Sequence, residues 1–174
     1  MTDRPNQCFP PSAPLANGEP QLLSGLADGR QSSAALAIAR GARRCLLAHG
    51  HATLTEVTLP NGRRADLATV TEAGEIWIVE IKSSLADFRS DGKWREYRDY
   101  CDRLLFAVDR GFPVDVLPAD CGLVLADRYG GEIIRAAPEH KLPPARRKVL
   151  LQRLVRVAAL RLHALADPEV VLSE

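Results

Sequence analysis

Residues 75–82 read E-I-W-I-V-E-I-K, an apolar strand that ends in a Glu-x-Lys sequence. A strand this apolar is typical of a sheet interior that is covered on both faces. Burying a carboxylate and an ammonium group in such a place costs free energy unless each finds a partner. Glu80 and Lys82 therefore need a reason to be there, and Asp66 on the preceding apolar segment is the first candidate partner.

Three strand-like segments succeed one another around this run, at residues 52–59, 64–71 and 75–82. The intervening sequences P-N-G and E-A-G are turn signals, and they are too short to connect parallel strands. The three segments are therefore expected to form an antiparallel meander.

The short second turn also predicts a register. A hairpin in which Thr71 faces Glu75 places Asp66 directly opposite Glu80. Because side chains alternate along a strand, Lys82 lies on the same face as Glu80. A register slip of two residues keeps this face, whereas a slip of one residue destroys it.

The remaining pattern predicts an α/β protein with the element order α-β-β-β-α-β-β-β-α and a mixed central sheet flanked by helices. Residues 30–166 are expected to form one domain, with a proline-rich tail at 1–29 and a second tail at 167–174. Helices are expected at 31–49, at 91–102 and from Pro143-Pro144 to about 166. Ser32 or Ser33 is the expected N-cap of the first helix. Further strands are expected at 103–108, 121–127 and 132–137.

Two carboxylates side by side in a sheet destabilise it unless a cation lies between them. Mg²⁺ and Mn²⁺ take oxygen ligands, commonly one or two carboxylates plus water and substrate phosphate. Asp66 and Glu80 suit such an ion, and Lys82 could orient the nucleophile or neutralise charge on the phosphate. The alternative is a salt bridge between Asp66 and Lys82 at the sheet rim, with Glu80 in solvent.

These residues and their strands resemble the PD-(D/E)XK nuclease superfamily over about residues 30–110. That superfamily has a restriction-endonuclease-like α-β-β-β-α-β core, to which this chain would add a hairpin and a C-terminal helix. The resemblance implies that Asp66 and Glu80 are metal ligands, that the backbone carbonyl of Ile81 is a further ligand, and that Lys82 is catalytic. Ala65 stands where the signature has proline, which does no chemistry there.

A longer match is to the MmcB-type family of bacterial DNA repair proteins, through G-R-R-A-D at 62–66 and the run at 76–108 that begins I-W-I-V-E-I-K-S-S-L-A-D-F-R-S-D-G-K-W. It implies a role in the repair of damaged DNA and an endonuclease activity. With the carboxylate pair, the expected function is a Mg²⁺-dependent endonuclease that hydrolyses phosphodiester bonds of damaged or branched DNA. A DNA-binding repair accessory that keeps the fold without cutting is the alternative. DNA is the expected partner; a homodimer and other repair proteins are compatible partners.

Many related nucleases carry another acid on the first helix, and this chain has none there. Glu56, on the first strand, is the nearest substitute as a metal ligand. An ordinary solvated glutamate is an equal alternative, because the alternation of that strand does not fix which face Glu56 occupies.

Net charge is only +1, so the distribution of basic residues must indicate any nucleic-acid surface. The last helix has seven Lys or Arg and no acid between residues 140 and 166, with Leu151, Leu154, Val155, Ala158 and Leu162 expected on its packed face. A solubilising surface is the alternative to phosphate contact. The DNA-contact candidates are Arg40, Arg43 and Arg44 on the first helix, Lys93 after the motif, and Arg146, Arg153 and Arg156 on the last helix.

Other features of the sequence narrow the class of protein. The four cysteines have no zinc-binding spacing, and no segment has the length of apolar sequence that a bilayer requires. A cytoplasmic, nucleoid-associated protein with no membrane contact is expected.

His49 and His51 form H-x-H, which is better explained by interaction with the end of a helix than by metal binding. Trp94 and Tyr97 have the spacing of a buried helix face, which favours core packing over stacking on exposed bases.

Overall fold

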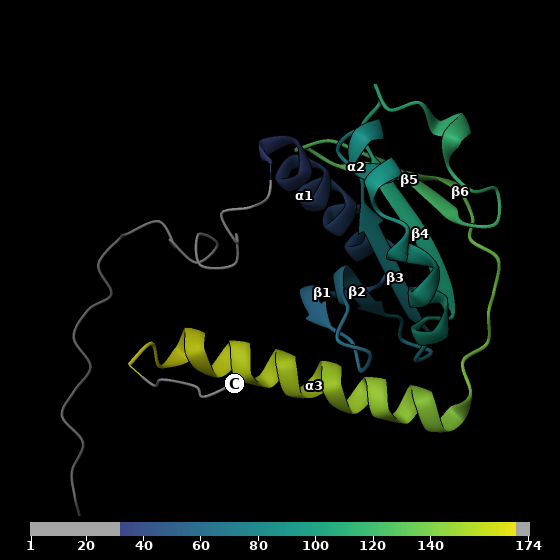
Figure 1. Cartoon of the computed structure of the whole chain (residues 1–174). Coiled ribbons are helices and arrows are strands. Elements are labelled where there is room, and N and C mark those ends of the chain that lie inside the picture. The colour runs from purple at the N-terminus through teal and green to yellow at the C-terminus, as the bar shows by residue number, and fades with distance from the viewer. Residues whose placement is uncertain (1–31, 170–174) are drawn as a thin grey trace, which may run out of the picture.

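A computed structural model describes residues 32–169, so the expected tail at 1–29 and the last residues of the tail at 167–174 lie outside it. The order of elements is the predicted one (Figure 1). The elements are α1 (Ser33–Ala48), β1 (Ala52–Thr58), β2 (Arg64–Val70), β3 (Ile76–Ile81), α2 (Leu85–Ser90), the 3-10 helix η2 (Lys93–Tyr100), β4 (Arg103–Val108), the 3-10 turn η3 (Val114–Val116), β5 (Gly122–Ala126), β6 (Gly131–Arg135) and α3 (Pro144–Ala166).

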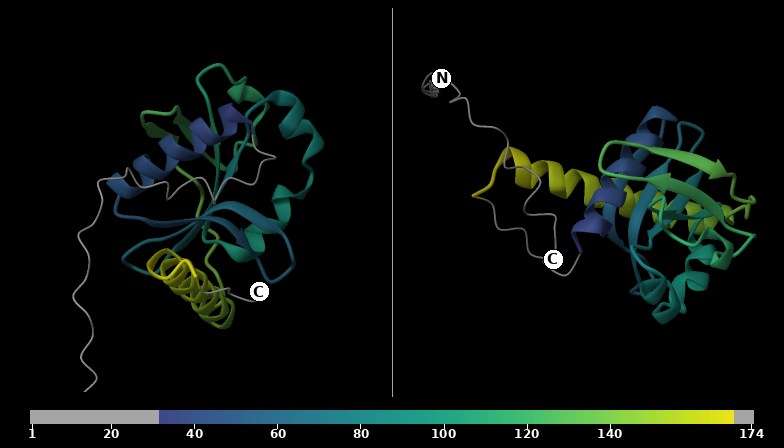
Figure 2. Two further views of the ribbon diagram at one scale, coloured as in Figure 1. Left: turned by 90° about the vertical axis from the view of Figure 1, so that its left-hand side faces the viewer. Right: turned by 90° about the horizontal axis from the view of Figure 1, so that it is seen from above.

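The six strands form one mixed sheet in the order β1-β2-β3-β4-β5-β6. The first three strands are an antiparallel meander, β4 and β5 continue parallel to β3, and β6 returns antiparallel. Helix α1 covers one face of the sheet and α3 crosses the other (Figure 2). The predicted fold class, an α/β protein with a mixed sheet between helices, is therefore confirmed.

The sheet separates two hydrophobic cores. Ile38, Ala42 and Leu46 of α1 pack against one face, while Leu150 and Leu154 of α3 join the core on the other face, together with side chains of η2. Burying side chains on both faces is what the apolar run at 75–82 predicted. Such burial is the main favourable contribution to folding.

The predicted hairpin register is confirmed. Leu67 pairs with Val79 and Thr69 with Trp77, which is the register that a tight turn at 72–74 imposes. The backbone N–H of Thr71 donates to the carbonyl of Glu75 at 3.0 Å, as expected for the residues that close the turn. Gly74, with φ of 79°, supplies the left-handed conformation that this turn needs.

The helix predicted at 91–102 forms only in part, as the shorter 3-10 helix η2 at Lys93–Tyr100, and it does not begin at Asp91. Ser84 caps the α-helix α2 instead, its hydroxyl accepting the N–H of Asp87 at 3.1 Å, and that helix ends at Asp91. Asp91 is extended, with ψ of 90°, and its carboxylate accepts the backbone N–H of Lys93, so the chain changes direction before the 3-10 helix η2 begins. Local hydrogen bonds of Asp compete with helix in this way.

The face of α3 that packs on the sheet also differs from the prediction. Leu154 is buried as expected, but Val155 and Leu162 are 68% and 67% exposed. Leu150, which was not expected on the packed face, is buried instead. Val155 adjoins the buried Leu154 and therefore lies on a face of α3 that points away from the sheet. The last residues of α3 extend beyond the sheet (Figure 1), so Leu162 has no core beneath it. A helical wheel shows the periodicity of a helix but not where along its length the sheet stops.

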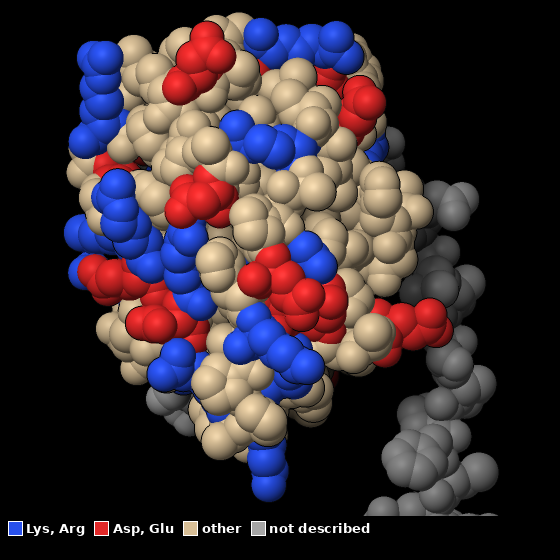
Figure 3. Space-filling model, turned by 90° about the vertical axis from the view of Figure 1, so that its right-hand side faces the viewer, with Lys and Arg blue, Asp and Glu red and all other residues tan. Residues whose placement is uncertain are grey.

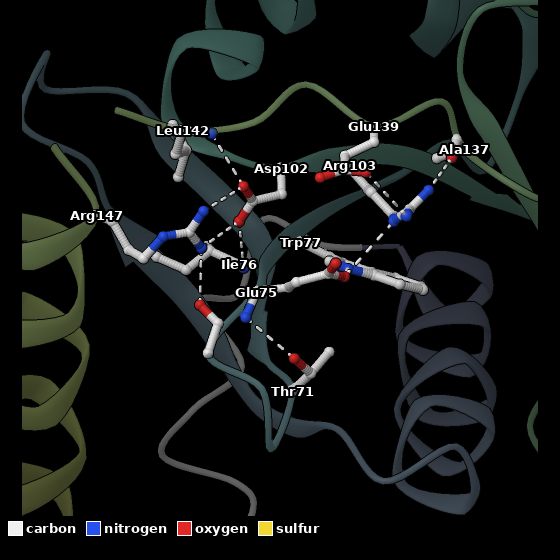
Figure 4. Close-up of polar contacts among 11 residues, drawn as sticks. Thr71, Glu75, Ile76, Trp77, Asp102, Arg103, Ala137, Glu139, Leu142 and Arg147 are labelled. Atoms are coloured by element: carbon white, nitrogen blue, oxygen red, sulfur yellow. Dashed lines mark hydrogen bonds and ion pairs between the residues drawn. The ribbon is translucent and has the colours of Figure 1, made fainter. Parts of the chain in front are cut away.

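Asp102 anchors the start of α3 to the sheet (Figure 4). It is 1% exposed, and the guanidinium of Arg147 donates to its two oxygens, each at 2.6 Å. The backbone N–H groups of Ile76 and Leu142 donate to the same carboxylate at 2.8 and 3.0 Å. Burial opposes the charge of Asp102, but the hydrogen bonds from Arg147, Leu142 and Ile76 together outweigh it, and the pKa of Asp102 lies below its usual range.

Gly41 lets α1 approach the β5–β6 hairpin closely. A Cβ added there would lie 2.0 Å from the backbone oxygen of Asp127 and 2.3 Å from that of Gly130. Replacing glycine by alanine within an exposed helix normally stabilises it by about 1 kcal/mol. We expect Gly41→Ala to destabilise the protein by roughly 1–3 kcal/mol instead, because the backbone must move to admit the methyl group.

Chemical denaturation of Gly41→Ala beside Gly92→Ala checks this expectation. An added Cβ at Gly92 meets nothing within 4 Å, and its φ is −81°, so that variant should unfold like the wild type or slightly later. Equal midpoints for the two variants would show that α1 does not contact the hairpin so closely.

Candidate active site

Asp66, Glu80 and Lys82 meet in one cleft of about 420 Å³ near the end of β3. β2 and β3 supply the carboxylates, and Lys82 is the first residue after β3. The N-terminus of α1 forms one wall through Ser32 and Ala35. The volume lies within the range of small-ligand clefts. The other lining residues are Arg64, Ile81, Ser83, Asp87, Asp91 and Tyr97.

The two carboxylates lie side by side, as the hairpin register requires. The backbone N–H of Asp66 donates to Glu80 Oε1 at 3.4 Å, and the N–H of Ile81 donates to Asp66 Oδ2 at 2.8 Å. Glu80 is 3% exposed. A rim salt bridge with Glu80 in solvent, the alternative drawn from the sequence, therefore does not describe this site.

Burial and mutual repulsion disfavour two negative charges in this cleft. Burial, the largest effect, and then the charge of Asp66 raise the pKa of Glu80 well above its ordinary value. Burial likewise raises the pKa of Asp66 to about 6, against the opposing effects of the Ile81 N–H and Lys82. A carboxylate pair with such pKa values is a common feature of functional sites.

Lys82 is held by an acid that the sequence pattern did not indicate. Its Nζ lies 2.6 Å from Asp91 Oδ2 and 3.7 Å from Glu80 Oε2. Burial opposes the charged form of Lys82, but the hydrogen bond to Asp91 and the charge of Glu80 outweigh it and raise the pKa of Lys82. Lys82 is therefore an ammonium group. Asp91 could not be assigned from the sequence, because its side chain reaches the cleft only through the break between α2 and η2.

Glu56 lies close enough to Asp66 for its charge to raise the pKa of Asp66. The pairs that flank it, Thr55 with Leu67 and Val57 with Ala65, place it opposite Asp66 in the sheet. Its φ is 51°, the left-handed region that a glutamate seldom adopts. Its side chain forms an ion pair with Arg64, with 2.5 Å between Glu56 Oε2 and Arg64 Nε. Backbone strain of this kind concentrates at functional sites.

The donor set of the cleft fits a hard divalent cation. Asp66 and Glu80 supply carboxylate oxygens, and the Ile81 carbonyl is the further ligand implied by the sequence pattern. Within residues 32–169 no group of three or more His, Cys, Asp or Glu side chains is arranged to hold a metal ion. Water and substrate phosphate would therefore have to complete the coordination shell, which is usual for Mg²⁺.

The predicted DNA-contact arginines lie outside this cleft. Arg40, Arg43 and Arg44 line a separate pocket farther along α1. On the other face of the sheet, Arg146 donates to the backbone oxygen of Asp99, and the Nε of Arg153 is buried. The last two candidates, Lys93 and Arg156, are exposed.

Helices α1 and α3 therefore do not flank the cleft together. On the face that carries the loop between β6 and α3, basic and acidic side chains are interspersed (Figure 3). That face presents no broad surface of one sign, unlike the arginine cluster of α1.

Tyr97 and Arg64 also line the cleft, which the sequence analysis did not predict for either residue. Tyr97 is 6% exposed, as its predicted core packing requires, but its hydroxyl also donates to the Arg64 carbonyl at 3.1 Å at the cleft wall. Burial, followed by the charges of Glu80 and Asp66, raises the pKa of Tyr97. The i, i+3 spacing of Trp94 and Tyr97 indicated a buried face correctly but could not indicate what else that face adjoins.

Comparison with known proteins gives two matches. A solved structure of the SPO1766 protein of unknown function from Silicibacter pomeroyi is 48% identical, covers 82% of this chain and 97% of its own, and superposes with a TM-score of 0.78. No curated protein matches the chain. Among residues 32–169, none of the helices has the length and apolar character needed to cross a membrane. The model of the family described as DNA repair protein MmcB-like matches residues 23–169, and the chain belongs to this MmcB-like family of DNA repair proteins.

Proposed function

We propose that this protein is a metal-dependent endonuclease that hydrolyses phosphodiester bonds in damaged or branched DNA. The observation that carries the proposal is the pair formed by the half-buried Asp66 and the buried Glu80, beside the ammonium of Lys82, in a cleft open to a ligand. A protein that only binds DNA has no need for a carboxylate pair whose burial opposes its own charge. Asp66 on β2, Glu80 on β3 and Lys82 directly after β3 are the basis of the resemblance to the PD-(D/E)XK nucleases.

Asp66 and Glu80, with the Ile81 carbonyl, would hold Mg²⁺ or Mn²⁺. When bound, such an ion polarises a phosphate oxygen and lowers the pKa of a coordinated water. The hydrogen bond from the Ile81 N–H keeps Asp66 oriented toward Glu80. Lys82, tethered by Asp91, places a positive charge within 3.7 Å of Glu80, where it can neutralise charge that develops on the phosphate.

Cleavage of a panel of duplex, flapped, gapped and junction DNAs tests the proposal. The wild type should cut at least one of them in Mg²⁺ or Mn²⁺ and none in EDTA. If the protein binds these DNAs and cuts none with either metal, the accessory role is correct and the nuclease proposal fails.

The carboxylate pair predicts an unusual pH dependence of stability in EDTA. Both acids have raised pKa values in the folded protein, so the folded state holds protons that the unfolded state has already lost above about pH 4. Their contribution to the free energy of unfolding should therefore fall as pH rises from about 4.5 to 7.5. Binding of Mg²⁺ or Mn²⁺ should strengthen over the same interval, because the ligands lose their protons.

Thermal unfolding of the wild type and of Asp66→Asn/Glu80→Gln across this pH interval checks whether the contribution of the pair to stability falls as pH rises. The variant is needed because burial lowers the pKa of His51, which makes stability rise with pH in the same interval. Asp91 and Asp102 have lowered pKa values and lose their contribution only below about pH 4. The difference in melting temperature, variant minus wild type, should grow with pH; a difference independent of pH would contradict the raised pKa values.

A further inference from the structure

A second pocket, of about 320 Å³, lies between the C-terminal half of α1 and the start of β1, and Leu47 and Ala52 form the apolar part of its lining. Its polar lining comes from Arg40, Arg43 and Arg44 on the helix and from His51 and Thr53 at the strand. None of these residues lines the cleft of Asp66 and Glu80. The pocket is therefore a separate site, and its binding properties do not depend on whether the acidic cleft cuts DNA.

Within residues 32–169 the three arginines of this pocket form no ion pair with an acid. Helix α1 has no acid, and within residues 32–169 neither Arg40 nor Arg43 has a hydrogen bond or ion pair. Arg44 donates only to backbone oxygens, those of Arg128 and Tyr129, at 3.2 and 2.9 Å. Like charges three and four residues apart on a helix repel each other. An anion in the pocket would remove that repulsion.

The pocket also has buried polar atoms that lack partners. His51 is 5% exposed, and within the described residues neither its Nδ1 nor the hydroxyl of Thr53 has a hydrogen bond. The imidazole packs edge-on against Trp77 with 4.3 Å between ring centres, so its orientation is fixed. Buried polar groups are nearly always paired, and such exceptions call for an explanation. A ligand with oxygen atoms would supply partners once the side chains that cover these two atoms move, because both atoms are fully covered in this structure.

We propose that this pocket binds a phosphate group. Guanidinium groups match the geometry of phosphate oxygens and donate to them in pairs, and a hydroxyl and an imidazole can add further bonds. The phosphate comes either from the DNA backbone or from a free phosphate in solution.

The position of the pocket favours the DNA backbone as the source of the phosphate group. Ala35 lines the acidic cleft, and the helical rise of 1.5 Å per residue puts Arg40 to Arg44 roughly 8–14 Å farther along α1. That interval spans roughly two to four phosphates of one strand. A strand whose backbone enters the cleft could thus continue along α1 to the arginines.

The test uses the full chain in EDTA, so that cleavage plays no part. Arg40→Gln/Arg43→Gln removes the two arginines that have no partner in the described structure. Lys141→Gln/Lys148→Gln is the matched control, because it removes two positive charges from exposed positions across the sheet. Inorganic phosphate is titrated first at constant ionic strength, with the ring signals of His51 and His140 followed by NMR. Binding of a labelled DNA duplex is then measured at several salt concentrations.

Phosphate should shift the signals of His51 but not those of His140 in the wild type, and the arginine variant should lose this shift. The arginine variant should bind DNA about 10-fold more weakly, with a salt slope lower by about two, while the control changes little. A phosphate response without a DNA effect assigns the pocket to free phosphate. An unchanged His51 signal, together with equal DNA binding by the two variants, would overturn the site.

Discussion

Glu80→Gln should abolish DNA cleavage while making the metal-free protein more stable. The amide has the shape of the carboxylate but cannot serve as an anionic metal ligand, so cleavage should fall by roughly 1,000-fold, ~4 kcal/mol of transition-state stabilisation. The same change removes a carboxylate that is 3% exposed and adjoins Asp66. At pH 7.5 in EDTA the free energy of unfolding should rise by about 1–2 kcal/mol.

A loss of cleavage together with a gain in stability would show that the carboxylate pair of Asp66 and Glu80 serves function rather than the fold. Glu96→Gln is the matched control, because Glu96 is exposed and pairs with Arg63 at 2.9 Å. That variant should cleave at the wild-type rate and unfold within about 0.5 kcal/mol of it. A Glu80→Gln protein that is less stable than the wild type would mean that the carboxylate of Glu80 stabilises the fold.

Asp102→Ala should produce the largest loss of stability in the described part of the chain, about 3 kcal/mol or more. The substitution leaves the guanidinium of Arg147 and the N–H groups of Ile76 and Leu142 without their shared acceptor. Removing one partner of a buried ion pair typically costs about 3–5 kcal/mol. The melting temperature should fall by roughly 10 °C, because unfolding of a chain of this size shifts by about 2–4 °C per kcal/mol.

The same substitution should loosen α3 before the rest of the molecule. Hydrogen exchange at Leu150 and Leu154, the buried residues of α3, should accelerate more in Asp102→Ala than exchange in β4. Asp99→Ala is the control, because that side chain is 76% exposed and its 3.5 Å ion pair with Arg146 contributes little. Wild-type melting of Asp102→Ala would show that α3 is held mainly by its apolar contacts.

The sequence predicted the sheet and the central site because both depend on local rules. A three-residue turn fixes the register of β2 and β3, and side-chain alternation then brings Asp66, Glu80 and Lys82 together. These features need no information about distant parts of the chain. The metal-binding and catalytic roles of the three residues stay predictions.

The features that were wrong or missing depend either on a break within a helical segment or on contacts between distant segments. Asp91 reaches Lys82 because α2 ends there, and the apolar pattern of the segment gave no sign of that break. The exposure of Val155, beside the buried Leu154, results from which face of α3 packs on the sheet, and that of Leu162 from the edge of the sheet beneath α3. The separation of the α1 arginines from the cleft likewise depends on how α1 crosses the sheet.

Direct measurement of Mn²⁺ binding by electron paramagnetic resonance at pH 7.5 tests the central claim that Asp66 and Glu80 form a metal site. The wild type, Asp66→Asn, Glu80→Gln and the control Glu96→Gln are titrated without DNA. We expect one Mn²⁺ to bind the wild type and Glu96→Gln with equal affinity, and each substitution in the cleft to weaken binding at least about 10-fold. Equal Mn²⁺ binding by all four proteins would contradict a metal site at these two carboxylates.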